Sequence, residues 1–241
     1  MRFTDHLYTA ARPIWDAQLE HPFVRGIADG SLDPETFKNW VRQDYLYLKE
    51  YSRMFAWGAA KSQRLDSMGW YAKLLDLILN LEMGLHRSYA ERFGITLEEL
   101  EGEQMWPTAR AYTDFLVRTA ADGDMADLVA ALLPCAWGYA YVGEGIASGE
   151  KPSDERYADW IAMYVSPEFT GARDWLIDEM NRLAEGATAE KRERLTEIFV
   201  LSSRYEWMFW EMCWQTERWA PELRKPLSVT PPQRSARFHQ G

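Results

Sequence analysis

The side chains of this chain with the greatest chemical potential are a cysteine and several acids set among aromatic rings. Cys135 follows Pro134 in an apolar stretch, and a proline inside a helix loosens the backbone so that the next side chain can enter a cavity. Tyr139, four residues later, lies on the same helical face. A lone cysteine in an apolar helix is more often a small core residue, so this segment leaves both roles open.

A second candidate group lies in the aromatic run 205–214, which contains Glu206, Glu211 and Cys213. Burying a carboxylate among rings is costly, and an apolar surround raises a carboxyl pKa toward the range of a general acid. Five residues turn a helix by about 140°, so we expect one of the two glutamates to face solvent. Cys213 is two helical turns from Glu206, too far for both to act on one small ligand.

A third acid, Asp44, shares a helical face with Tyr47 and Tyr51. An acid flanked by phenols is suited to hydrogen bonding a polar heterocycle, although a solvated aspartate beside amphipathic tyrosines fits the segment equally well. The chain holds twelve Trp, twelve Tyr and ten Phe, enough for bulky core packing or for a pocket around a flat ligand. Together, a thiol, isolated acids and many rings indicate a pocket for a flat nitrogen heterocycle.

Metal and phosphate sites have little support in the residue pattern. The chain has four His, and the nearest approach to a ligand pair is Glu82 with His86, which equally fits a hydrogen-bonded pair. No second matched pair accompanies it, and the glycines at 138–145 lack the strand that a phosphate loop requires. We therefore expect no metal and no organic cofactor.

Net charge and composition limit the kinds of partner that the chain can bind. A net charge of −10 is poorly suited to binding nucleic acid or anionic lipid. The longest uncharged run, residues 128–143, is shorter than the roughly 20 apolar residues of a membrane span. The first residues lack the apolar run of a secretory signal, and two cysteines are expected to stay reduced. We expect a cytoplasmic protein without nucleic-acid or membrane partners.

Helical periodicity dominates the chain and predicts a single all-α domain over residues 1–221. A Thr-Asp cap opens the first helix, Asp33-Pro34 and Thr96 with Glu99 are helix-start signals, and Pro134 predicts a kink. Expected helices cover residues 4–20, 34–61, 66–93, 107–122 and 125–148, and three more begin after N-caps at Ser153, Ser166 and Thr188. Residues 222–241 form a basic, proline-containing tail with a net charge of +3.

Motifs on separate predicted helices resemble the TenA family, the thiaminase II proteins. They are His21-Pro-Phe-Val-Arg-Gly-Ile-Ala-Asp-Gly-Ser-Leu32, Phe37-x-x-Trp40-x-x-Gln43-Asp44-x-x-Tyr47, Pro134-Cys135-x-x-x-Tyr139 and Tyr205-Glu206-x-x-Phe209-Trp210. The resemblance covers about residues 3–220 and leaves out the tail. It implies a heme-oxygenase-like helical bundle without heme, assembled as a homotetramer, and Cys135 places the chain in the cysteine-containing branch.

The resemblance also implies an activity, in thiamin salvage: hydrolysis of 4-amino-5-aminomethyl-2-methylpyrimidine to the hydroxymethyl compound and ammonia, with thiamin or formylated pyrimidines as further substrates. It makes Cys135 the nucleophile, Tyr47 the hydrogen-bond partner of the thiol and Glu206 the acid for the departing amine. The remaining residues that it assigns to substrate binding are Asp44, Tyr139, Tyr112, Tyr164 and Phe209.

Two other classes of function compete with this interpretation. A non-catalytic pyrimidine- or thiamin-binding protein, such as a regulatory one, would keep the pocket but has little use for both Cys135 and Glu206. A helical-bundle metal oxidase is disfavoured by the missing ligand pairs. The surface offers one further expectation: Trp70, Tyr71 and Trp160 lie on amphipathic helices, look exposed and favour an oligomer.

Overall fold

The computed structural model describes residues 2–221, apart from the side chains of Leu81, Glu82 and Leu85. Within that part of the chain all regular secondary structure is helical, as the periodicity predicts. The elements are α1 (Phe3–Leu19), α2 (Pro22–Asp29), α3 (Pro34–Lys61), α4 (Leu65–Asp76), the π-helix η1 (Leu77–Glu82), α5 (Met83–Arg92), α6 (Leu97–Gly102), α7 (Pro107–Asp122), α8 (Met125–Ala147), α9 (Glu155–Tyr164), α10 (Pro167–Leu183) and α11 (Ala189–Gln215). The predicted tail 222–241 lies outside the described residues.

Most of the predicted helix starts are confirmed. The Asp33 side chain accepts from the Glu35 amide with Pro34 in the first turn of α3, and Thr96 forms a reciprocal capping box with Glu99. The hydroxyls of Ser166 and Thr188 accept from the amides of Phe169 and Lys191 and so cap the starts of α10 and α11. Local side-chain chemistry therefore sets these boundaries.

Four details differ from the prediction. The N-cap of α1 is Arg2, whose amide is bonded by Asp5, and the N-cap of α9 is Asp154 instead of Ser153. Helix α2 was not expected, because its eight residues are too few to show a period. The expected helix 66–93 is interrupted by η1, where a π-turn inserts an extra residue and re-aims the side chains of α5.

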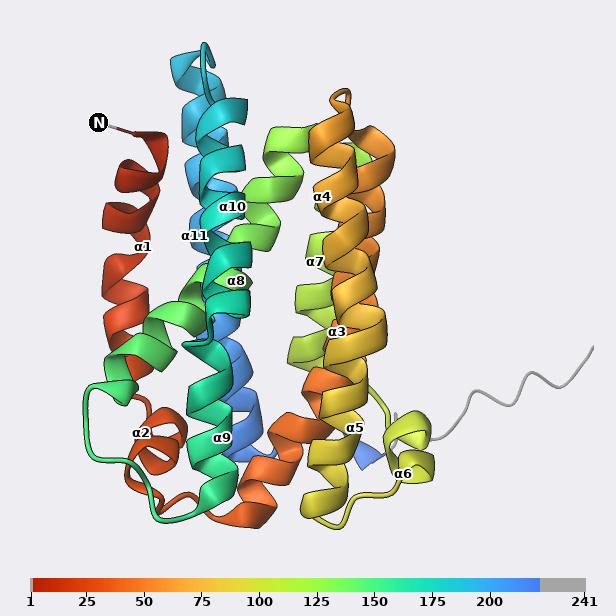
Figure 1. Ribbon diagram of the computed structural model, residues 1–241, viewed down its shortest axis with the longest axis vertical. Coiled ribbons are helices and arrows are strands. Elements are labelled where there is room, and N and C mark those ends of the chain that lie inside the picture. Colours follow the sequence, from red (N-terminus) through yellow and green to blue (C-terminus); the bar gives the residue numbers. More distant parts are fainter. Residues whose placement is uncertain (1, 222–241) are drawn as a thin grey trace, which may run out of the picture.

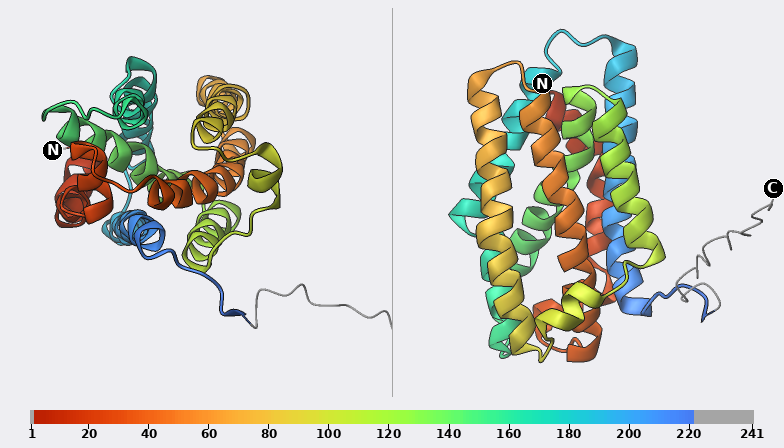
Figure 2. Two further views of the ribbon diagram at one scale, coloured as in Figure 1. Left: turned by 90° about the horizontal axis from the view of Figure 1, so that it is seen from below. Right: turned by 90° about the vertical axis from the view of Figure 1, so that its right-hand side faces the viewer.

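The helices form two groups that meet where α3 and α7 lie against α8 and α11 (Figures 1 and 2). Helices α1 and α8 pack on α11 and on each other, α10 packs on α8 and α1, and α4 and α7 pack on α3. Figure 1 shows α8 changing direction partway along its length, at the level of the predicted kink. The functional residues predicted from the sequence lie on α3, α7, α8, α9 and α11, so this arrangement decides which of them meet.

Helix α8 is the central helix of the bundle. By length and composition its 23 residues would suffice to cross a membrane, but 78% of the most apolar window is buried inside the protein. The apolar run therefore serves as core. The expected exposure of three aromatics is only partly correct: Trp70 is 37% exposed, whereas Tyr71 and Trp160 are buried. The rings of Tyr71 and Trp160 are covered by packing within the chain itself.

Candidate active site

The backbone around Pro134 positions Cys135. Proline lacks an N–H and strains the preceding helical turn, so carbonyls there need other donors. The Ser202 hydroxyl donates to the Ala131 carbonyl at 2.6 Å, and the Tyr51 hydroxyl donates to the Leu132 carbonyl at 3.1 Å. Side chains from α11 and α3 are thereby fixed against α8 one turn before Cys135.

The Cys135 thiol meets an acid from another helix. It is in hydrogen-bonding contact with the Glu206 carboxyl of α11 and with the Tyr51 hydroxyl of α3. The Tyr112 hydroxyl of α7 donates to Glu206 Oε1 and lies 3.1 Å from the Ser202 hydroxyl. Four helices thus converge on one thiol and one carboxyl, the two groups that hydrolysis by addition to a ring requires.

Glu206 is the glutamate that points inward. It is 2% exposed, and burial raises its pKa from 4.5 to about 7, against the opposing effect of hydrogen bonds from Tyr112 and Cys135. The Glu211 side chain is 38% exposed and bonds His21 Nε2 at 3.0 Å. The predicted division between the two glutamates is confirmed, and Glu206 has the protonation behaviour of a general acid near neutral pH.

Tyr47 differs from its expected role. Its hydroxyl is buried and has no hydrogen-bond partner among the described residues, whereas Tyr51 is the phenol bonded to the thiol. The Tyr47 ring packs 5.3 Å from the Tyr112 ring and edge-on to Phe209 at 5.7 Å. A buried hydroxyl without a partner costs free energy, and its position beside Cys135 leaves it available to a ligand or water.

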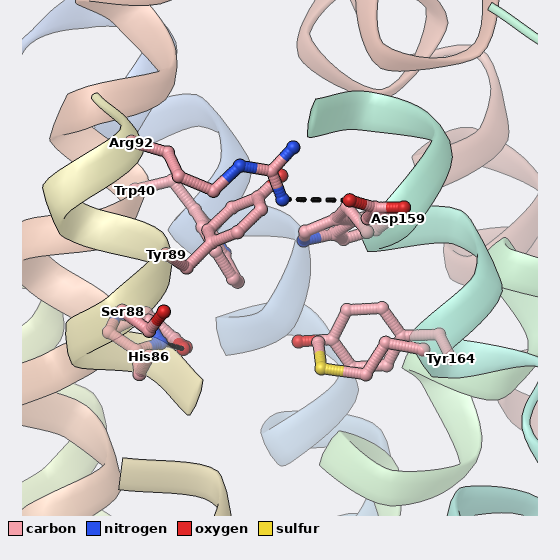
Figure 3. Close-up of a pocket in the computed structure, with 10 residues that line it drawn as sticks. Trp40, His86, Ser88, Tyr89, Arg92, Asp159 and Tyr164 are labelled. Atoms are coloured by element: carbon pink, nitrogen blue, oxygen red, sulfur yellow. Dashed lines mark hydrogen bonds and ion pairs between the residues drawn. The ribbon is translucent and has the colours of Figure 1, made fainter. Parts of the chain in front are cut away.

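Asp44 lines a cavity of about 260 Å³ between α5 and α9. Figure 3 shows Arg92 of α5 and Asp159 of α9 facing each other across it, joined by an ion pair of 2.7 Å. The remaining lining residues are mainly aromatic: Trp40, Tyr89, Trp160 and Tyr164, with His86, Ser88 and Met163. A cavity with flat aromatic walls, and with Asp44 as the lining carboxyl that is not paired with Arg92, suits a planar polar ligand.

Tyr139 joins the cavity to the thiol. Its hydroxyl accepts from Trp40 Nε1 at 3.1 Å, and its ring lies 4.8 Å from that of Tyr164. Burial raises the pKa of Tyr139 well above its usual value, and Asp44, Glu206 and Cys135 are all close enough to add to that effect. Tyr139 therefore stands between the acid of the cavity and the thiol–carboxyl pair.

All eight residues predicted for the site gather in this region. The residues that sequence reasoning missed as site members are Tyr51, Ser202, Trp160 and His86. The four-residue spacing from Tyr47 was a usable signal for Tyr51, but spacing along one helix cannot say which phenol reaches a thiol on another. His86 bonds the Val41 carbonyl and faces Asp44, and the side chain of Glu82, its partner in the sequence pattern, lies outside the described part of the structure.

A helical bundle with a half-buried thiol, a buried acid and an aromatic pocket defines an all-α protein built for chemistry on a flat heterocycle. The family model described as TENA/THI-4/PQQC family matches residues 8–216. This chain belongs to that family.

Individual relatives agree with this assignment. The chain is 43% identical over 220 residues to an aminopyrimidine aminohydrolase of Halalkalibacterium halodurans, covering 91% of this chain and 98% of that one. It is similar to a solved TenA homologue from P. horikoshii with a TM-score of 0.84 and 29% identity, covering 89% and 99% of the two chains. A domain of Shewanella denitrificans with a heme-oxygenase-like fold has a TM-score of 0.65 at 13% identity, covering 88% and 92%, which confirms the predicted fold.

Proposed function

We propose that this protein is an aminopyrimidine aminohydrolase of thiamin salvage. Its substrate is 4-amino-5-aminomethyl-2-methylpyrimidine, and its products are the 5-hydroxymethyl compound and ammonia. The observation that carries the proposal is the hydrogen-bonding contact between the Cys135 thiol and the buried Glu206 carboxyl, close to the aromatic rings of Tyr47, Tyr112 and Tyr139. A protein that only bound the pyrimidine would gain nothing from a nucleophile held against a buried acid.

The first step is addition of the Cys135 thiolate to C6 of the pyrimidine. Asp44 holds the 4-amino group and the neighbouring ring nitrogen and shares a proton with that nitrogen, which draws electrons from the ring. Tyr139 and Tyr164 pack on the ring, and Phe209 closes the pocket beside Tyr47.

The second step breaks the exocyclic carbon–nitrogen bond. Addition to C6 leaves a double bond between C4 and C5. Its electrons form an exocyclic double bond from C5 to the methylene carbon, and Glu206 gives its proton to the amine so that ammonia leaves. Water then adds to the methylene carbon and returns a proton to Glu206. The ring double bond re-forms and the Cys135 thiolate is released, so the enzyme ends as it began.

Three tyrosine hydroxyls, on α3 and α7, lie beside Cys135 and Glu206. Tyr112 bonds Glu206 and fixes the carboxyl that points at the thiol. Tyr51 bonds the thiol in the role expected of Tyr47, which leaves the unpartnered Tyr47 hydroxyl to hold the attacking water or the amine. The chemistry uses protein side chains and water alone.

The test is product analysis by liquid chromatography and mass spectrometry. The aminomethylpyrimidine, its N-formyl derivative and thiamin are incubated separately with the protein, and the hydroxymethylpyrimidine is measured. We expect that product from the aminomethyl compound, with thiamin cleavage as a slower thiaminase II activity. Binding of the pyrimidine without any product would instead establish the non-catalytic alternative.

We also propose a cytoplasmic homotetramer. Neither Cys135 nor Cys213 forms a disulfide within the described part of the chain, which fits a reducing compartment. Large apolar side chains stay exposed along α4 and η1 in the single chain, and a second copy would cover them. They are Leu65, Met68, Trp70, Leu77 and Leu79.

A further inference from the structure

The hydroxyl of Ser202 on α11 has its hydrogen fixed by a backbone carbonyl. Ser202 Oγ lies 2.6 Å from the Ala131 carbonyl oxygen of α8, and a carbonyl oxygen only accepts. The single hydrogen of the serine hydroxyl therefore lies between these two oxygens, and Ser202 can only accept from a further partner. Among the described residues that further partner is the Tyr112 hydroxyl of α7, 3.1 Å away.

Tyr112 lies between two groups that can both accept its hydrogen. Besides contacting Ser202, its hydroxyl is bonded to Glu206 Oε1, and a phenol has one hydrogen to donate. When Glu206 is ionised, that hydrogen goes to the carboxylate, and the oxygens of Tyr112 and Ser202 then face each other with no hydrogen between them. When Glu206 is protonated, the carboxyl donates to Tyr112 and Tyr112 donates to Ser202, so both hydroxyls donate and accept.

Burial makes the difference between these two arrangements matter. Ser202 and Tyr112 are fully buried, and Glu206 is 2% exposed. Two oxygens in contact without a hydrogen between them are costly where solvent does not reach. Ser202 therefore disfavours the ionised form of Glu206. The pKa of Glu206, which burial raises to about 7 against the bond from Tyr112, is shifted in the same direction.

The other groups that face Glu206 bring no fixed charge to it. The helices packed on α11 are α1, α2, α3, α7 and α8. The described side chains that shift the pKa of Glu206 are Tyr112 and Cys135, which both favour its ionised form, and no charged side chain and no residue of α1 or α2 is among them. Burial raises the pKa of every nearby phenol well above its usual value, so these groups stay neutral; they are Tyr47 and Tyr51 of α3, Tyr112 of α7 and Tyr139 of α8.

We propose that Ser202 is a positioning residue for the general acid: by accepting the hydrogen of Tyr112, it keeps Glu206 protonated in the empty enzyme. The inference rests on the proposed function. As the amine leaves, it takes the proton of Glu206, and the Tyr112 hydroxyl turns its hydrogen from Ser202 to the new carboxylate. When water adds and returns a proton to Glu206, the Tyr112 hydrogen turns back to Ser202. The Tyr112 O–H bond rotates and does not break, so the proton count of the reaction is unchanged.

The neighbouring serine offers a matched control. Ser203 of α11 is as buried as Ser202, donates to the Phe199 carbonyl at 2.9 Å and accepts from Trp15 Nε1 at 3.3 Å. It therefore makes the same kinds of hydrogen bond, one donated to a carbonyl and one accepted. Neither partner is Tyr112 or Glu206, so Ser203→Ala removes a buried hydroxyl without changing the hydrogen bonds of the acid.

Infrared titration of the ligand-free protein tests the proposal. The carboxyl band of protonated Glu206, identified by its absence in Glu206→Gln, is followed as the pH is raised through about 7. In Ser202→Ala the Tyr112 hydrogen is left to Glu206 alone, so the midpoint should fall by roughly 1–2 pH units, the size of one hydrogen bond to a charged group. The pH at which ammonia release declines should fall by the same amount. Ser203→Ala should keep both wild-type midpoints.

A midpoint in Ser202→Ala equal to that of the wild type would overturn the inference. If Ser202→Ala does not fold, the phenol band of Tyr112 in the wild type, assigned by its absence in Tyr112→Phe, decides. It should change from that of a hydroxyl that donates and accepts to that of one that only donates as Glu206 ionises, and a hydroxyl that only donates throughout refutes the inference. A wild type that releases no ammonia from the aminomethylpyrimidine would refute the proposed function itself, a result that the ligand-free titration separates from the outcome at Ser202.

Discussion

Replacing Glu206 by glutamine tests the general acid and the energetic consequence of its burial in one variant. Glutamine keeps the shape and can still accept from Tyr112, but it cannot give a proton to the departing amine. A positioned general acid contributes roughly 10²–10⁴-fold to rate, so ammonia release by Glu206→Gln should fall by that factor while the pyrimidine still binds. In the wild type, turnover should decline as pH rises through about 7, where Glu206 loses its proton.

The same pKa fixes the sign of a stability change. Burial raises the pKa of Glu206 from 4.5 in the unfolded chain to about 7 in the folded protein, so the folded state holds the proton more tightly. Stability from this group is full below the unfolded pKa and is lost as pH rises through the folded pKa. The loss at high pH is about 3 kcal/mol. Glutamine does not ionise, so Glu206→Gln does not lose this stability at high pH.

Thermal unfolding at two pH values measures this pH-dependent loss of stability. For a chain of this length about 3 kcal/mol corresponds to roughly 6–10 °C in Tm, so Glu206→Gln should melt that much higher than wild type at pH 8.5. At pH 5 the two should agree within roughly 1 kcal/mol, the value of one altered hydrogen bond. Glu211→Gln, on the partly exposed side of α11, is the control and should change neither activity nor the pH trend. A Glu206→Gln protein that stays active, or that melts lower at pH 8.5, would refute the assignment of the acid.

Three further results are expected. Tyr47→Phe removes a buried hydroxyl that lacks a hydrogen-bond partner among the described residues, so the free energy of unfolding should stay the same or rise by up to roughly 1 kcal/mol. Turnover should fall at least tenfold. A fall in both turnover and stability would mean that the hydroxyl is structural. Cys213→Ser should keep activity within a few-fold and lose roughly 1–3 kcal/mol on denaturant unfolding, because the new hydroxyl is buried; inactivity would give Cys213 a catalytic role. Light scattering should report four times the 28.1 kDa of one chain, and a 28.1 kDa particle at micromolar concentration would count against the tetramer.

The sequence predicted the fold through features that are local in the chain. Asp33, Thr96, Ser166 and Thr188 each cap a helix within three residues of themselves, so their signals need no knowledge of the rest of the protein. The break in the expected helix 66–93 could not be predicted this way, because a π-turn leaves no distinct residue pattern.

The site was predictable in its members but less so in its contacts. Helical spacing placed Glu206 and Glu211 on different faces, and burial in the fold then decided that Glu206 is the inner one. Which phenol bonds the thiol depends on how α3 packs against α8, and this is why Tyr51 takes the place expected of Tyr47. The pairing of His86 with Asp44 joins α5 to α3, a distance along the chain over which residue spacing carries no information.

The central claim is that Cys135 makes this protein release ammonia from an aminomethylpyrimidine. Its most direct test is ammonia production from 4-amino-5-aminomethyl-2-methylpyrimidine by chelator-treated wild-type protein beside Cys135→Ser. We predict steady ammonia release by the wild type and none above background by Cys135→Ser, while calorimetry should show that the variant still binds the pyrimidine. Ammonia release by Cys135→Ser at the wild-type rate would contradict it.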